Sequence, residues 1–180
     1  MPELFEFYAR VRETDTGLRE INDIIKKLKN QEVLVGVPQD KSGRNVSQSS
    51  QSISNAELLY IHTNGSPVNN IPARPVIEPA IEDAKEEIGL LLKEAAEQAL
   101  NRNLEGAMAK IDKAGMQGEN AAKGWFRNPK NHWAPNSQVT IEGSTPNKNG
   151  KKFIKGKKSS TPLIDTGQMR KAITHVMREK

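Results

Sequence analysis

The sequence predicts an α+β fold, in which a small mixed or antiparallel sheet packs on long helices with extended loops between the elements. Three observations lead to this prediction. Short runs of alternating or continuous apolar residues indicate strands near both ends of the chain. Two long stretches place apolar residues at helical spacing. Segments rich in Gly, Pro, Ser and Asn separate them.

The strands are expected at residues 4–12, 32–37 and 172–178, all in one sheet. The first alternates, with apolar residues at every second position; these are Phe5, Phe7, Ala9 and Val11. The second is an apolar run that ends before Pro38, which lacks an N–H to donate to a neighbouring strand. The third is the last apolar run of the chain, and we expect it to return to the sheet begun by the other two.

Helices at 16–29 and 79–101 are expected to cover this sheet. The first has apolar residues spaced three or four apart at Leu18, Ile21, Ile25 and Leu28. Pro79 suits the first turn of the second helix, where no N–H is needed. A shorter helix is expected to begin with Asn55 as its cap. A further helix at about 103–127 is rich in Gly and Ala, which predicts that another backbone packs closely against it.

Composition divides the chain into three parts: an α+β core with long helices at 1–127, an extended basic arm at 128–162, and a returning helix and strand at 163–180. Within the first part, residues 39–54 have a low-complexity composition typical of a mobile loop. Within the last part, Asp165 or Thr166 is expected to cap a short helix through Met169.

The 180 residues include no cysteine, which excludes disulfides, thiol catalysis and cysteine-ligated zinc. The N-terminus lacks the pattern of a signal peptide and no segment is apolar enough to span a membrane, so we expect synthesis in the cytoplasm. The net charge of +5 is unevenly divided. Residues 1–100 carry 11 basic and 16 acidic residues, a net charge of −5, and residues 101–180 carry 16 and 6, a net charge of +10.

No catalytic, cofactor-binding or metal-binding residue is predicted. His62, His132 and His175 have no metal-site spacing. The single Asp165-Thr166-Gly167 differs from the paired, strand-borne motif of aspartic proteases. The remaining candidate is a group of four carboxylates at the start of the 79–101 helix, which complement the helix dipole more simply than they bind a metal ion; they are Glu82, Asp83, Glu86 and Glu87.

The lysine-rich part of the arm is the strongest candidate for binding a macromolecule. It contains Lys148, Lys151, Lys152, Lys155, Lys157 and Lys158. These side chains could contact phosphates, with aromatic residues nearby as stacking platforms. They lack the arginines that read base edges, so sequence-specific recognition is not expected. A solvated arm, or one that binds an acidic neighbouring protein, remains an alternative.

Three stretches together resemble the neck and tail-completion proteins of tailed bacteriophages. AELLYIHTNGSPVNNIPARPVIEPAI resembles a segment in which a helix ends in His-x-x-Gly and leads into Ile-Pro-Ala-Arg-Pro. WAPNSQVTIEGS, followed after a basic loop by TPLIDTGQMRKAIT, resembles the C-terminal signature of the family. The resemblance covers about residues 55–82 and 133–176. This chain departs from the usual pattern at Thr63, where an acidic residue is common, and at Val76, where Phe is common.

The resemblance implies a non-enzymatic virion protein of the head–tail junction or upper tail, made in the host cytoplasm and assembled as a homomeric ring, hexameric or dodecameric. Head-closure, tail-terminator or tail proteins would be its neighbours. The alternative is a nucleic-acid-binding or nuclease accessory protein that uses the lysines. The resemblance implies that Ile71-Pro72-Ala73-Arg74-Pro75 is a stiff connector that orients the long helix, and that Arg74 forms an ion pair within or between subunits. The remaining expected interface residues are Trp125, Phe126, Trp133 and Phe153.

Overall fold

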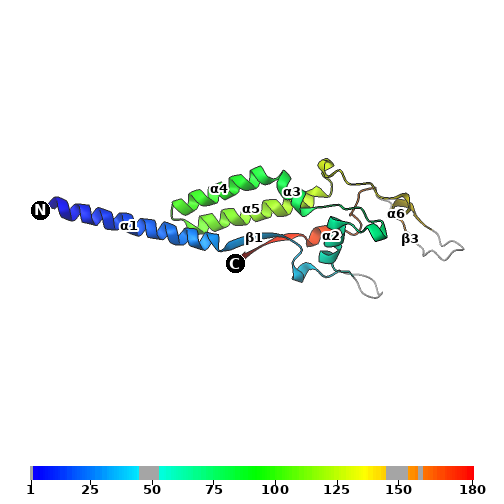
Figure 1. The fold of residues 1–180 in the computed structure, drawn as a ribbon, viewed down its shortest axis with the longest axis horizontal. Helices are drawn as coiled ribbons and strands as arrows, with labels where there is room; N and C mark the ends of the chain where they lie inside the picture. The colour runs from blue at the N-terminus through cyan, green and yellow to red at the C-terminus, as the bar shows by residue number, and fades with distance from the viewer. Residues whose placement is uncertain (1, 45–52, 145–153, 158–159) are drawn as a thin grey trace. The chain divides into compact units, whose positions relative to one another are not determined.

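The computed structural model describes residues 2–44, 53–144, 154–157 and 160–180. Within these ranges it describes the side chains from residue 16 onward, except those of residues 154 and 155. The fold is α+β, as expected, with helices predominating and a small antiparallel sheet packed on them (Figure 1). The chain forms two compact units that alternate along the sequence. Unit 1 comprises Met1–Leu34, Lys85–Gln117 and His175–Lys180, and unit 2 comprises Val35–Ala84 and Gly118–Thr174.

The first element corrects the expected strand at 4–12. These residues belong to one helix, α1, at Pro2–Lys29, which also contains the expected helix at 16–29. The segment alternates, but it is also rich in Glu, Leu, Ala and Arg, which favour helices. A helix that has already formed at 16–29 extends at low cost because each added residue gains one hydrogen bond. No glycine or proline between Glu3 and Thr16 interrupts it.

The sheet therefore has two of the three expected strands. β1 at Gln31–Gly36 pairs with β4 at Thr174–Glu179. The backbone N–H of Lys180 donates to the carbonyl of Asn30 at 2.8 Å, and Arg178 forms an ion pair with Glu32 at 2.8 Å. The prediction that the end of the chain returns to the sheet is confirmed by this pairing.

Two helices of unit 1 lie side by side (Figure 1). α4 at Lys85–Leu100 and the first part of α5 at Leu104–Trp125 are joined by a tight turn in which Arg102 has a left-handed backbone, with φ of 59°. The buried residues between them are small; they are Ala95, Ala99, Ala107 and Ala114. Side chains link the pair further along, Lys110 to Glu94 and Gln117 to Glu87.

Gly115 of α5 shows why this helix is rich in small residues. A Cβ atom at this position would lie 2.7 Å from both the Val33 side chain of β1 and the His175 ring of β4. Since real Cβ contacts are longer, a side chain here would push the strands away from the helix. The close contacts at Gly115 are thus with side chains of the strand pair, and not with the neighbouring backbone that the composition of this helix predicted.

The core of unit 2 gathers side chains from four segments. Its buried members are Leu59, Val76, Ala80, Ala122, Trp125, Phe126, Met169 and Ile173. Its helices are α2 at Asn55–Asn64, α3 at Ile77–Asp83, the end of α5, and α7 at Gln168–Ala172. α7, at the red end of the colour scale, lies against α2 (Figure 1). Short 3₁₀ turns occur at Gln39–Lys41, Pro67–Asn69 and Pro129–Asn131.

The arm expected to be irregular contains short regular elements. α6 at Gln138–Glu142 is followed by β2 at Gly143–Ser144, which pairs antiparallel with β3 at Ile154–Lys155. Gly143 pairs with Lys155, and Ser144 pairs with Ile154. A Ser137 cap, whose hydroxyl accepts from the Thr140 N–H, begins the helix.

Three helix boundaries differ from the sequence prediction. The expected helix at 79–101 is two helices, α3 and α4, because the chain leaves helical geometry at Ala84. α2 is capped by Ser54 rather than Asn55, through a capping box with Glu57. α7 has Gly167 as its N-cap, one residue after the expected positions, although the Thr166 hydroxyl still accepts a long hydrogen bond from the Gln168 N–H at 3.4 Å. Residues 45–52 of the expected mobile loop lie outside the described residues.

Candidate assembly site

The C-terminal end of α2 turns the chain into the Ile-Pro-Ala-Arg-Pro segment. Gly65 ends the helix with φ of 74°, and a Cβ atom there would lie 2.8 Å from the backbone nitrogen of Ala73. Ser66 and Ile71 exchange two backbone hydrogen bonds, at 2.8 and 2.9 Å. The N–H of Arg74 then donates to the carbonyl of His62 at 2.6 Å. Glycine is needed at position 65 because the returning backbone leaves no space for a side chain and the φ is left-handed.

Arg74 is buried in unit 2, with 7% of its surface exposed. Its guanidinium donates to the carbonyl of Ala134, from Nε at 3.2 Å and Nη2 at 2.8 Å, and from Nη2 to the carbonyl of Pro135 at 3.3 Å. Burial lowers its pKa, although an arginine remains charged at neutral pH. Within the chain, Arg74 thus donates to backbone carbonyls and not to a carboxylate, and an ion pair between subunits stays a prediction.

Trp133 forms a second contact between the same two segments, in the opposite direction. Its indole Nε1 donates to the carbonyl of Pro75 at 3.2 Å, and its ring meets Phe126 edge to face with centroids 5.9 Å apart. The Ile-Pro-Ala-Arg-Pro and Trp-Ala-Pro-Asn segments, about sixty residues apart in the sequence, therefore hold each other through side chains that both donate to the opposite backbone.

Asn136 extends this junction to the third stretch. Its amide nitrogen donates to the carbonyls of Thr161 at 3.3 Å and Ser160 at 3.5 Å. A few residues later, Leu163 and Ile164 pack against the core. The three stretches that carry the family resemblance thus meet in unit 2, and we refer to the contacts of Arg74, Trp133 and Asn136 as the motif junction.

His62 lies beside the motif junction. Its Nδ1 is buried without a hydrogen-bond partner. Burial lowers the pKa of the imidazole, and the positive charges of Arg74 and Lys157 lower it further. The ring is consequently neutral at neutral pH. Lys157 is half-buried, its positive charge acts on His62, and its backbone N–H donates to the carbonyl of Thr140 at 3.0 Å.

The expected interface residues differ in how deeply the structure buries them. Trp125 and Phe126 are 6% and 1% exposed in the core of unit 2, so they contribute to this chain's own packing rather than to an exposed surface. Trp133 is only partly buried. Phe153 lies outside the described residues, as do the lysines at 148, 151, 152 and 158; Lys155 lies in β3.

The carboxylates considered as a metal site do not gather. Asp83 is bonded to Lys130 at 2.5 Å and to Asn128 at 3.3 Å, and the Lys130 hydrogen bond is the main cause that lowers the pKa of Asp83. Glu87 is bonded to Gln117. Among the residues that the structure describes, no three His, Cys, Asp or Glu side chains are placed to hold a metal ion. His175 is bonded to Asp112 at 3.2 Å.

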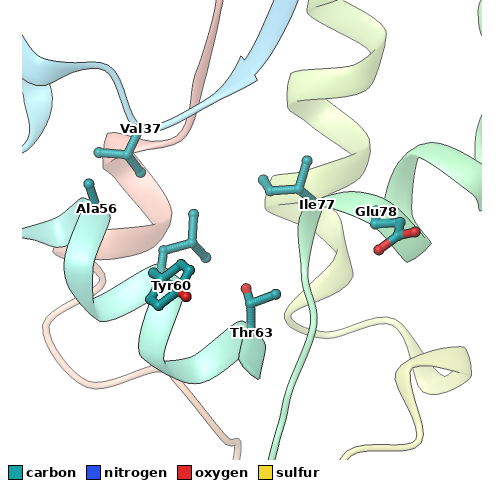
Figure 2. A pocket seen from close by; sticks show the side chains of 7 residues that line it. Val37, Ala56, Tyr60, Thr63, Ile77 and Glu78 are labelled. Carbon is teal, nitrogen blue, oxygen red and sulfur yellow. The ribbon is translucent and has the colours of Figure 1, made fainter. Parts of the chain in front are cut away.

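An apolar pocket of about 370 Å³ opens beside α2. Figure 2 shows Val37 and the side chains of α2 on one side and Ile77 and Glu78 of α3 on the other. The lining residues are Val37, Ala56, Leu59, Tyr60, Thr63, Ile77 and Glu78. Tyr60 is 71% exposed, which is unusual for an aromatic residue beside a core. No local sequence pattern marks this pocket, because its wall is assembled from three separate segments.

Comparison with protein-family models, with curated proteins and with solved structures finds no match for this chain. Over the described residues, no helix is both long enough and apolar enough to cross a membrane.

Proposed function

We propose that this protein is a structural virion component of a tailed bacteriophage, a neck or tail-completion protein that helps to join head and tail and assembles as a homomeric ring. The motif junction is the observation that supports this most. A chance resemblance of three short stretches would not require that they touch. In unit 2, Arg74, Trp133 and Asn136 join all three through side-chain bonds to the backbone.

The charge distribution is consistent with assembly from identical subunits. A net charge of −5 over residues 1–100 and of +10 over residues 101–180 lets an acidic face of one copy meet a basic segment of the next. Contacts of this head-to-tail kind close into rings when the rotation between copies divides the circle. Head-closure, tail-terminator or tail proteins would bind the two faces of such a ring.

The test is genetic complementation of the source phage. Deleting the gene should yield filled heads and separate tails in electron micrographs, and supplying the wild-type chain in the host should restore joined particles. The purified protein should sediment as a closed oligomer. The proposal is wrong if joined particles form without the gene, or if mass spectrometry of purified virions does not find the protein.

A matched pair of variants ties the function to the motif junction. Arg74→Met removes the buried donors and should fail to complement. Arg102→Met removes an exposed ion pair with Glu20 and should complement as the wild type does. Equal complementation by the two variants would separate the function from the junction.

A further inference from the structure

The pocket beside α2 has the character of a binding site for an apolar side chain. Its volume of about 370 Å³ lies in the range of protein ligand sites, and its walls are mostly aliphatic and aromatic. Tyr60 is largely exposed at its mouth, so the free chain leaves an aromatic surface in water. Aromatic residues in such positions are enriched where proteins bind one another.

The rim of this pocket carries one carboxylate, that of Glu78. Glu78 lines it and is exposed, and α3 carries three carboxylates and no basic residue. The other two carboxylates, Glu82 and Asp83, already have partners, Asp83 with Lys130. An apolar group flanked by positive charge would therefore match both the wall and the rim.

One segment of the same sequence has this chemistry. The connection between β2 and β3, residues 145–153, ends in Phe153 and contains Lys148, Lys151 and Lys152 without any acidic residue. The aromatic side chain can fill an apolar pocket, and the lysines can face the carboxylate at its rim. No other stretch of the sequence places an aromatic residue directly after two lysines.

We propose that Phe153 of one copy of this chain inserts into the pocket formed by Tyr60, Thr63 and Ile77 of a second copy, with Lys151 and Lys152 facing Glu78. This inference rests on the proposed ring assembly and names the contact that builds it. A projection on one copy and a recess on the next form a heterologous interface, which is the kind that generates rings.

The two parts of the contact have different roles. A buried aromatic side chain supplies most of the affinity at an interface, so Phe153→Ala should weaken subunit association about 10- to 100-fold. Rim charges mainly alter the association rate, so Glu78→Lys should slow association about three- to tenfold. Glu105→Lys, at an exposed position in the first turn of α5, is the matched charge control.

The absence of cysteine allows a direct test by cross-linking. Tyr60→Cys and Phe153→Cys are made as separate full-length variants, mixed, and oxidised with copper-phenanthroline. A disulfide-linked dimer should form in the mixture and not with either variant alone. Thr63→Cys replaces Tyr60→Cys in a parallel mixture, in case loss of the tyrosine disturbs α2. Val68→Cys, at a position 93% exposed and away from the pocket, is the matched control and should not cross-link.

The double variant Tyr60→Cys/Phe153→Cys distinguishes contact between copies from contact within one copy. A ladder of linked subunits on a denaturing gel supports the proposal, whereas a linked monomer overturns it. Failure of both mixtures to cross-link also overturns it, whether the protein is oligomeric or monomeric. The proposed function is decided separately by the presence of the protein in virions, so closed rings that do not cross-link would refute the contact and leave the function standing.

Discussion

At the scale of single residues, Arg74 is the side chain on which the packing of unit 2 most depends. A buried guanidinium is costly unless its donors are used. Here they bond to the carbonyls of Ala134 and Pro135, next to Trp133, whose indole donates back to the carbonyl of Pro75. These hydrogen bonds offset the cost of burying Arg74, and they fix how two segments that are distant in the sequence align.

Arg74→Met should reduce the free energy of unfolding of unit 2 by about 1–3 kcal/mol, because the two carbonyls lose their donors while they remain partly enclosed. Urea unfolding followed by tryptophan fluorescence measures this. The chain has two tryptophans, Trp125 and Trp133, and both lie in unit 2. An unchanged midpoint would show that these hydrogen bonds contribute nothing net.

His62 should make unit 2 sensitive to mild acid. In the folded chain the pKa of His62 lies below its ordinary value of 6.5. At a pH between the folded and the unfolded pKa, the unfolded chain therefore binds a proton on His62 that the folded chain does not bind. The free energy of unfolding of unit 2 is therefore unaffected by protonation of His62 above about pH 6.5, and it decreases as the pH falls below that value. In His62→Asn the loss of stability between pH 7 and pH 5 should be smaller than in the wild type, as measured by urea midpoints. An equal loss in both proteins would assign the effect to other groups.

At the scale of elements, small residues decide how closely helices and strands approach. α5 meets β1 and β4 at Gly115, where Val33 and His175 occupy the space that a side chain would need. α4 instead has Gly89 at a position where an added Cβ would have nothing within 4 Å. Of these two helical glycines in unit 1, Gly115 lies where a side chain would clash, whereas Gly89 lies where a side chain has space.

Substituting these glycines should change stability in opposite directions. Gly89→Ala should raise the thermal midpoint, since alanine is favoured in a helix by about 1 kcal/mol. Gly115→Ala gains the same helical preference but must displace Val33 or His175, so its midpoint should fall, as overpacking costs about 1–3 kcal/mol. Circular dichroism at 222 nm on heating provides the comparison. Stabilisation by both substitutions would mean that β1 and β4 move away from α5 without cost.

At the scale of the whole molecule, the division of charge between the two parts of the sequence governs how copies meet. Raising the salt concentration shortens the Debye length from about 30 Å at 0.01 M to about 3 Å at 1 M. Subunit association, followed by light scattering after mixing, should therefore slow as salt increases. In Lys151→Gln/Lys152→Gln this dependence should be weaker. A rate independent of salt in the wild type would show that apolar contacts alone bring the copies together.

The sequence by itself determined the elements whose apolar pattern is compatible with only one type of secondary structure. Periodic apolar residues identified the helix at 16–29, and the run before Pro38 identified β1. These features are local, because each depends on residues within a few turns of one another.

Only the tertiary structure decided the rest. The alternation at residues 4–12 suits a strand, yet those residues extend α1, because a short apolar run has no period of its own strong enough to exclude a helix. Trp125 and Phe126 looked like surface anchors and proved to be core, since burial depends on what α2 and α7 place over them. The partners of Arg74 are backbone carbonyls sixty residues away. Carbonyl groups are present at every position of a chain, so no sequence pattern could have selected these.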